Sequence, residues 1–554
     1  MKLNYKRTVF VGFAFFLICA FWQAYDNTIP LILTNKFGLS QTASGVVMAL
    51  DNILALFLLP LFGALSDKCR HRLGRRTPFI LVGTIIAALA FVGLTFADNM
   101  QLKNIEAVSK IDDPAALTEI YRAEKDVEIQ TPDGETFTLS SRFTLEEFSA
   151  IPSQLVLEDG TIMKYSCTSW GEPVTEKYVL ADKLTDAEKE TALSRKNGTV
   201  FTNPHYTKYV VPARQAYAWS VTQSSPTPLI FFMLLLLIVL VSMAIFRSPA
   251  VALMPDVTIK PLRSKANAVI NLMGSAGGIL VLGLGMVFAT SAVRNSLMSY
   301  TLYFAVIAGI MLLALLIFMW KVREPKLVEH MRAESRKYGI DEGDDDGTGG
   351  RKLSRDERRS LAFLLASIVL WFMGYNAVTS KYSVYASNIL HKDYNLTLII
   401  AQAAAIISYL PVGMVASRLG RKKTILAGVV MLTAAFGVAC FLRESSPTVL
   451  MNAMFALAGI GWATINVNSF PMVVELCRGG NVGKYTGFYY TASMAAQTVT
   501  PMISGFFMDQ FGMTTLFPYA AVFAALAFAT MLFVMHGDNK PVAKKGLEAL
   551  DVED

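Results

Sequence analysis

Apolar segments of about 20 residues recur along most of the chain and alternate with polar stretches, and a helix of that length spans the roughly 30 Å hydrocarbon core of a bilayer. The pattern therefore predicts an all-α membrane protein with twelve transmembrane helices. The predicted helices cover residues 8–33, 43–64, 78–97, 228–250, 265–290, 298–320, 360–386, 395–417, 423–442, 447–470, 484–508 and 515–535.

Two hydrophilic stretches interrupt this series of helices. Residues 321–359 are charged and contain glycine, which predicts a solvated, partly disordered linker that separates six helices from six. Residues 98–227 are too long for a simple loop, and segments 127–140 and 154–166 each place Asp-Gly beside alternating apolar residues, as β-hairpins do. We therefore expect a small β-containing external domain, either a lid or spacer or a separate binding module.

These features predict six regions along the chain. They are spans one to three of an N-terminal bundle (1–97), an extracytoplasmic inserted domain (98–227), spans four to six (228–320), a cytoplasmic linker (321–359), a C-terminal bundle (360–536) and a cytoplasmic tail (537–554).

Composition and charge agree with a multi-pass membrane protein, since 53% of the residues are hydrophobic and only 17% are charged. Lys and Arg gather on alternate loops of the twelve-helix arrangement, and such loops remain in the cytoplasm. Both termini are therefore predicted to be cytoplasmic, in a cell (plasma or inner) membrane. Because this bias explains the net charge of +7, no nucleic-acid partner is expected.

A short polar motif follows the second predicted helix and returns, altered, after the eighth. The first copy contains Gly63, Asp67, Gly74, Arg75 and Arg76, and the second contains Gly413, Arg418, Gly420 and Arg421. A glycine lets helices approach closely, an acid can pair with a cation, and the cations hold the turn at the headgroups. A general basic patch at the membrane surface is the alternative interpretation.

Two acids end the fourth and tenth predicted helices on the side of these basic loops, Asp256 and Glu475. They are candidate gate charges that pair with the loops in one conformation and release them in another. Ordinary solvation of a helix end is the alternative.

The Gly-Asp-cation pattern resembles the signature of the major facilitator superfamily. Within that superfamily, residues 63–80 (GALSDKCRHRLGRRTPFI) and 248–280 (SPAVALMPDVTIKPLRSKANAVINLMGSAGGIL) resemble the sucrose-transporter and glycoside-cation-symporter branch. The resemblance implies two six-helix bundles that work by alternating access, and a sugar moved together with a proton or a sodium ion.

The chain departs from both branches where they carry charges. Plant-type sucrose carriers have an arginine where this chain has Val251, and the acid farther up that span falls at about Leu240. Melibiose-type carriers have acids where this chain has Leu59 and Ala55. Their cation sites therefore cannot be transferred to this chain.

Ionisable residues at membrane depth are costly and normally functional, which singles out Asp26 and Asp51. A carboxyl in such a place can take up a proton on one side and release it on the other. Both are candidate coupling sites, with a structural hydrogen bond as the alternative. Lys381 is expected to snorkel to the surface or to pair with an external acid.

A sugar needs neutral hydrogen-bond partners for its hydroxyls and an aromatic ring for its C–H face. The predicted helices supply amides and rings at compatible positions, although each could instead serve helix packing. The substrate-binding candidates are Trp22, Gln23, Asn27, Asn52, Asn267, Asn271, Tyr375, Asn376, Trp462, Asn466, Tyr490 and Gln497.

Enzyme motifs are absent from the sequence: we find no Walker loop, no HExxH and no nucleophile elbow. We expect no catalysis, no metal and no cofactor beyond a coupling ion. The expected protein is a monomeric secondary symporter for a di- or oligosaccharide or a glycoside, coupled to protons or to sodium. An exporter of drugs or another metabolite and a transporter-like sugar receptor are the alternatives.

Overall fold

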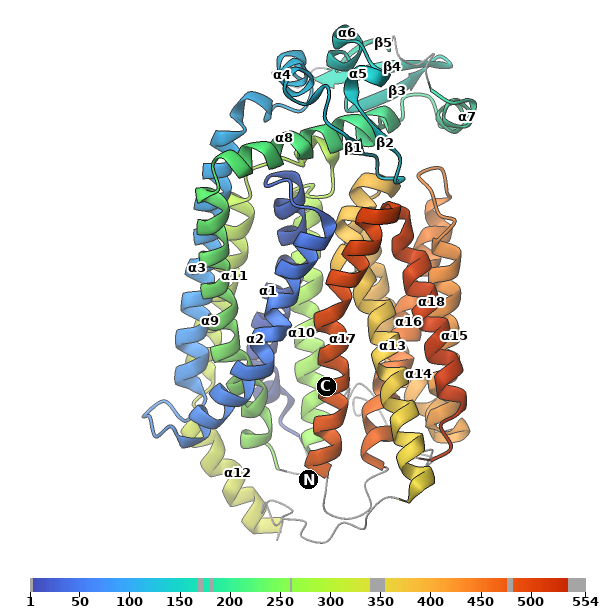
Figure 1. Cartoon of the computed structure of the whole chain (residues 1–554). Coiled ribbons are helices and arrows are strands. Elements are labelled where there is room, and N and C mark those ends of the chain that lie inside the picture. The colour runs from blue at the N-terminus through green and yellow to red at the C-terminus, as the bar shows by residue number, and fades with distance from the viewer. Residues whose placement is uncertain are drawn as a thin grey trace.

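The computed structural model describes residues 3–167, 173–178, 184–259, 262–338, 354–475 and 482–536. Long helices form two bundles side by side, one from each half of the chain, and a small mixed domain covers one end of both (Figure 1). We call this end the insert end. The N-terminus and α12 lie at the other end, which we call the terminal end.

The long helices coincide with the predicted apolar segments. The N-terminal bundle contains α1 (Tyr5–Asn35), α2 (Gln41–Lys68), α3 (Thr77–Asn104), α9 (Thr227–Val257), α10 (Arg263–Val287) and α11 (Thr301–Lys321). The C-terminal bundle contains α13 (Arg355–Tyr385), α14 (Tyr394–Leu419), α15 (Arg421–Ala439), α16 (Thr448–Glu475), α17 (Val482–Phe511) and α18 (Leu516–Leu532).

Ten helices within the described residues are long and apolar enough to cross a membrane, and α14 and α17 fall outside that set. The prediction of an all-helical membrane architecture is therefore confirmed in its main feature. The boundaries differ most at the ends of α3 and α9, which continue to Asn104 and Val257, past the predicted ends at residues 97 and 250.

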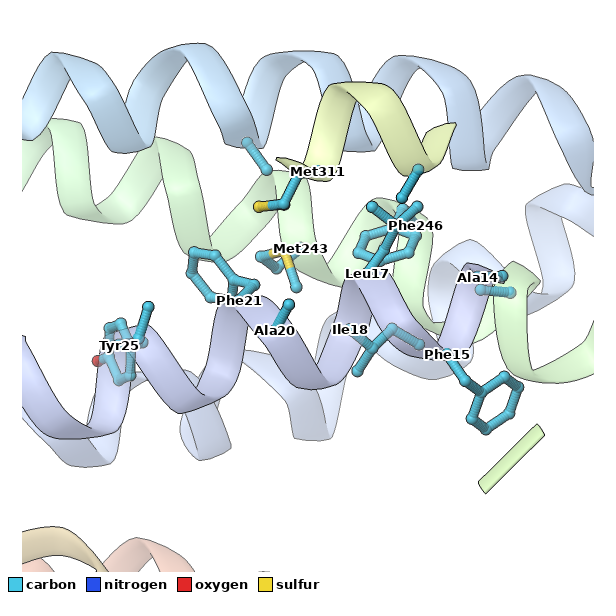
Figure 2. Close-up of a cluster of buried hydrophobic side chains, with 14 of the residues drawn as sticks. Ala14, Phe15, Leu17, Ile18, Ala20, Phe21, Tyr25, Met243, Phe246 and Met311 are labelled. Carbon is cyan, nitrogen blue, oxygen red and sulfur yellow. The ribbon is translucent and has the colours of Figure 1, made fainter. Parts of the chain in front are cut away.

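The core of the N-terminal bundle forms where α1 packs against α9 and α11. Figure 2 shows side chains of α1 directed toward Met243 and Phe246 of α9 and Met311 of α11. Helices approach closely where a glycine leaves room, because a Cβ on Gly83 of α3 would lie 2.6 Å from the Cβ of Phe246. The C-terminal bundle has a separate core around the fully buried Trp371.

The inserted domain contains both predicted hairpins. Strand β1 (Ile129–Gln130) pairs with β2 (Thr136–Phe137), and β3 (Gln154–Glu158) pairs with β4 (Thr161–Cys167). Asp159 and Gly160 between β3 and β4 both have positive φ, of 48° and 75°, which a tight hairpin turn requires. Strands β5 (Pro173–Lys177) and β6 (Val200–Thr202) complete an antiparallel sheet in the order β5-β4-β3-β6.

Helices in the inserted domain were not predicted. They are α4 (Pro114–Glu124), α5 (Leu139–Arg142), α6 (Leu145–Ser149), α7 (Asp186–Leu193) and α8 (Val211–Ser224). The last of these lies across the insert end of the bundles and leads directly into α9 (Figure 1). The domain has its own buried core, which includes Phe148, Leu155 and Tyr206.

The first part of the predicted linker, which was expected to be solvated and partly disordered, contains a helix that was not predicted. Residues Glu324–Tyr338 form helix α12, which carries the buried Met331 against the N-terminal bundle. Glu324, at its first position, is only 1% exposed. The rest of the predicted linker, residues 339–353, and the predicted tail, residues 537–554, lie outside the described residues.

Contact between the bundles is close at the insert end. A Cβ on Gly45 of α2 would collide with the backbone oxygen of Pro501 in α17, so these two helices touch at their backbones. The other half of α2 is different, because Phe57 and Leu61 are 68% and 49% exposed. The insert end is therefore closed, whereas toward the terminal end α2 diverges from α17 (Figure 1) and stays against α9 of its own bundle.

Candidate functional site

Three charged side chains from three helices of the N-terminal bundle lie near one another. Asp26 of α1 and Asp51 of α2 interact electrostatically with each other, and Arg247 of α9 interacts with both. The guanidinium carbon of Arg247 also lies 5.7 Å from the centroid of the Trp22 ring. The structure thus brings the two predicted coupling acids together and adds a cation that the sequence reasoning missed.

The charge cluster lies where the two bundles face each other. Asp26 also interacts with Tyr375 of α13, which belongs to the opposite bundle. Asn52 donates a hydrogen bond from Nδ2 to Oδ1 of Asp51 at 2.8 Å and so helps to orient that carboxylate. A change in the charge of Asp26 therefore alters electrostatic interactions with residues of both bundles.

The C-terminal bundle contributes an aromatic platform to this region. The rings of Tyr375 and Trp462 stack almost in parallel, with centroids 3.7 Å apart and 4° between their planes. Phe372 supports Trp462 edge-on at 5.1 Å. A rigid flat surface of this kind suits the C–H face of a sugar ring.

Amide groups connect the two bundles beside the platform. Gln402 of α14 donates from Nε2 to Oε1 of Gln23 in α1 at 2.5 Å. Gly278 of α10 makes room for this pair, because a Cβ there would lie 3.3 Å from both side-chain oxygens. Gln402 was not among the predicted residues.

Several polar atoms in this region have no hydrogen-bond partner among the residues that the structure describes. They are Nε1 of Trp22, the hydroxyl of Tyr25, Nδ2 of Asn376 and Oε1 of Gln402. Buried polar atoms are normally paired, so an unpaired group marks a place for water or a ligand. These atoms come from both bundles, and together with the aromatic platform they fit a neutral, hydroxyl-rich molecule.

The other predicted binding residues lie on helices α1, α10, α16 and α17. Asn27 is buried and donates to the backbone oxygen of Gln23 at 2.9 Å, so this hydrogen bond serves its own helix. Asn267 and Asn271 are partly exposed on α10, the helix that packs against α1. Tyr490 of α17 contacts Phe470. Among the described residues, no contact that we find links Asn466 or Gln497 to the cluster.

Arg247 could have been found in the sequence. It stands four residues before Val251, one helical turn from the position where sucrose-type carriers have an arginine. Of the two alternatives expected for Lys381, snorkelling is wrong, because this side chain is 0% exposed and donates from Nζ to the backbone oxygen of Gln41 at 2.6 Å. It also interacts electrostatically with Asp509 of α17.

The motif after α2 forms a network at the terminal end. Asp256 of α9 accepts from Arg75 at 2.5 Å and from Arg76 at 2.8 Å, and Asp67 also pairs with Arg76. Gly74 has φ +115° in the turn, a conformation that favours glycine. Gly63 lets α2 approach α9, since a Cβ there would lie 2.8 Å from Oγ of Ser248.

The second copy of the motif is built differently. Gly420 has φ +93° between α14 and α15, Arg418 is exposed, and Arg421 begins α15. Gly413 is partly exposed within α14. The side chain of Glu475 lies outside the described residues, so its predicted pairing with the basic loop stays a prediction.

Comparisons with known proteins agree with this architecture. Residues 215–401 and 388–551 match the family described as Major Facilitator Superfamily, and residues 11–107 match the family described as MFS/sugar transport protein. The chain belongs to the major facilitator superfamily. The superfamily prediction is therefore confirmed, and the superfamily is a class of transporters rather than of enzymes.

Individual relatives match only short stretches of the chain. Over 103 residues it is 33% identical to proton-associated sugar transporter A of Homo sapiens, which is 17% of this chain and 14% of the human protein. Over 68 residues it is 37% identical to a sucrose transport protein of Arabidopsis thaliana, which is 12% of this chain and 11% of that protein. These matches agree with the predicted resemblance to the sucrose-transporter branch.

A solved structure of a D-xylose-proton symporter resembles the whole chain. The TM-score is 0.56 at 14% sequence identity, over 97% of this chain and 99% of that one. At this identity the likeness shows the fold and not the substrate.

Proposed function

We propose that this member of the superfamily is a secondary active transporter that carries a disaccharide or a glycoside together with a proton, by alternating access. The observation that carries the proposal is that Asp26, clustered with Asp51 and Arg247, interacts across the bundle interface with Tyr375, which stacks on Trp462. The names of the sugar-transporting relatives support the substrate class.

The charges suggest how a proton would be coupled to movement. Two carboxylates and one guanidinium carry a net charge of −1 when all are ionised, and an uncompensated charge in a closed, low-dielectric site is costly. One proton on Asp26 or Asp51 removes that charge. Protonation would thus permit closure around a sugar, and return to the outside-facing state would follow release of both.

Alternating access fits the unequal ends of the molecule. The insert end is closed by contacts between α2 and α17, while the terminal half of α2 is exposed. We propose that the terminal end faces the cytoplasm of a cell that carries the protein, as a monomer, in its plasma or inner membrane. Labelling of single cysteines introduced at Glu329 and Asp186 from each side of intact cells tests this orientation.

Uptake into proteoliposomes tests the function. Wild-type protein is expected to concentrate a labelled disaccharide or glycoside when the outside is made acidic, and to lose the concentration gradient when a protonophore is added. A sodium gradient in place of the pH gradient tests the other coupling ion. Failure of a broad sugar panel to accumulate under either gradient would overturn the proposal.

Substitutions that neutralise the two candidate acids test where the proton is coupled to transport. Asp26→Asn and Asp51→Asn are each expected to abolish concentrative uptake while sugar exchange down its own gradient continues. Glu329→Gln, which neutralises an exposed carboxylate on α12, is the matched control and should behave as the wild type. Full proton-driven accumulation in both aspartate variants would show that the coupling acids lie elsewhere.

The same uptake assay distinguishes the proposed symporter from the two alternative functions. An exporter of drugs or another metabolite would move substrates with which sugars do not compete. A transporter-like receptor would bind sugar saturably without accumulating it.

A further inference from the structure

A cavity lies at the insert end, apart from the charge cluster. Its volume is about 360 Å³, within the range of small-molecule sites. Polar side chains of its lining include Gln41, Gln130, Gln215, Trp219, Asn388 and Asp509. We propose that this cavity is a second carbohydrate site, where a neutral mono- or disaccharide binds and holds the insert end closed.

Three parts of the molecule supply the walls. Gln41 belongs to α2 of the N-terminal bundle, Gln130 and Trp219 belong to the inserted domain, and Asn388 and Asp509 belong to the C-terminal bundle. Asp509 accepts hydrogen bonds from the backbone N–H groups of Gln41 at 2.8 Å and Thr42 at 2.7 Å. The cavity therefore exists in this form only while α2 and α17 remain together.

The lining favours a neutral polar ligand over an ion. No Lys or Arg lies among the lining residues that the structure describes, and the one carboxylate, Asp509, is already engaged by α2. The indole of Trp219 is 40% exposed and offers a ring face. Several primary amides line the same cavity, and an amide can both donate to and accept from a hydroxyl group.

One buried group points independently to a ligand. The side chain of Gln41 is 5% exposed, and its Oε1 has no hydrogen-bond partner in the described part of the chain. Leaving such an atom unpaired costs about 1–3 kcal/mol in general, so a bound hydroxyl would restore a favourable interaction. Gln41 is also fixed at its backbone by Lys381 and Asp509, which keeps the group in place.

A ligand that contacts all three parts binds only the conformation in which they are together. By its difference in affinity it shifts the population toward that state. The binding does not depend on the proposed transport function, whereas its consequence, slower transport at high sugar concentration, rests on it.

Direct binding to the full-length purified protein tests the site. Calorimetric titrations with glucose, sucrose and maltose would use a Trp462→Ala background, in which the central platform is removed. Residual binding is expected, and Trp219→Ala should weaken it about fivefold to tenfold, the usual worth of an aromatic contact. Gln41→Leu should weaken it to a similar extent. Trp320→Ala, which removes an exposed indole elsewhere, is the matched control.

The outcomes distinguish this proposal from the previous one. Absence of residual binding, or residual binding that Trp219→Ala and Gln41→Leu leave unchanged, would overturn the second site. Sugar binding that Trp462→Ala leaves unchanged would instead count against the central site. In uptake assays the wild type should slow at high sugar concentration, and Trp219→Ala should remove that inhibition without changing uptake at low concentration.

Discussion

The two ends of the molecule are stabilised by different kinds of contact. At the insert end, hydrogen bonds join parts that alternating access would move apart: Asp509 of α17 to α2, and Lys381 of α13 to Gln41. At the terminal end, Arg75 and Arg76 each donate to Asp256 within a single bundle. Contacts of the first kind must break for the insert end to open, whereas contacts of the second kind join segments of one bundle, and their predicted release in another conformation stays a prediction.

The inserted domain is covalently connected to one bundle and contacts the other at the insert end. Its chain leaves α3 and returns through α8 to α9, both in the N-terminal bundle. Its β1–β2 turn nevertheless rests on the other bundle, where Pro132 accepts from the backbone N–H of Met513 at 2.7 Å. A Cβ on Gly512 would lie 2.6 Å from the backbone of Asp133, so the two turns touch directly. The domain therefore bridges the bundles in the closed arrangement.

The largest expected effect comes from the terminal end. Glu324 of α12 accepts from the backbone N–H groups of Arg75 and Thr77, each at 2.8 Å, and from that of Arg76. Glu324→Ala leaves buried donors unpaired next to buried Arg76 and should lower stability by about 3–5 kcal/mol. Thermal unfolding in detergent measures this, with exposed Glu329→Ala as the control; equal loss in both would mean that the network is unimportant.

A smaller effect, of a different kind, is expected from Asp509→Asn. The substitution weakens three charge-assisted hydrogen bonds to Gln41 and Thr42, and should favour opening of the insert end by about 2–3 kcal/mol. Distances between spin labels placed across that end should broaden toward longer values. Stability should change little, and Asp186→Asn on the exposed surface of the inserted domain should leave the distances as they are.

The ion pair that joins the inserted domain to the C-terminal bundle should contribute less free energy to closure of the insert end. Arg195 pairs with Glu444 at 2.7 Å, and both are partly exposed, so their coupling should be about 1 kcal/mol. A double-mutant cycle with Arg195→Gln and Glu444→Gln, read from the same label distances, measures it. Additive effects of the two substitutions would mean that this pair does not hold the bridge.

Acid should affect this bridge only at low pH. Burial alone would raise the pKa of Glu444, but the hydrogen bond and charge of His391 and the charges of Arg195 and Lys392 together hold it below its ordinary value of 4.5. A carboxylate with a lowered pKa stabilises the contact fully above the ordinary value and loses that effect as pH falls through the lowered one. Label distances should stay constant down to about pH 4.5 and change below it, and Glu444→Gln should abolish that change.

The sequence predicted the long helices because each is a run of apolar residues, and it predicted the hairpins because Asp-Gly favours their turns. It did not predict α12, since that helix is polar and becomes ordered through Glu324 and Met331, whose partners lie far away in the chain. The two coupling acids stood out as charges in apolar segments. Arg247 is also a charge inside a predicted apolar segment, residues 228–250.

The rest of the candidate site depends on contacts between distant segments. Tyr375 and Trp462 were both candidates, but their stacking follows from the packing of α13 against α16, which no local pattern encodes. For Lys381 the pairing with an acid agrees with the structure, whereas the snorkelling alternative was wrong, although a long cationic side chain near a helix end usually reaches water. Here the backbone oxygen of Gln41 and the charge of Asp509 hold it inside the protein.

Helix α12 is a suitable place for a label that reports the rotation of the N-terminal bundle during transport. Since Glu324 caps the turn before α3 and Met331 is buried in the N-terminal core, α12 must rotate with that bundle as one body. A fluorophore on its exposed face, at Glu329, would report the orientation of the whole N-terminal half rather than local movement of a linker. Paired with a second dye on the C-terminal bundle, it would convert the transport cycle into a single optical signal recorded from the side opposite the inserted domain.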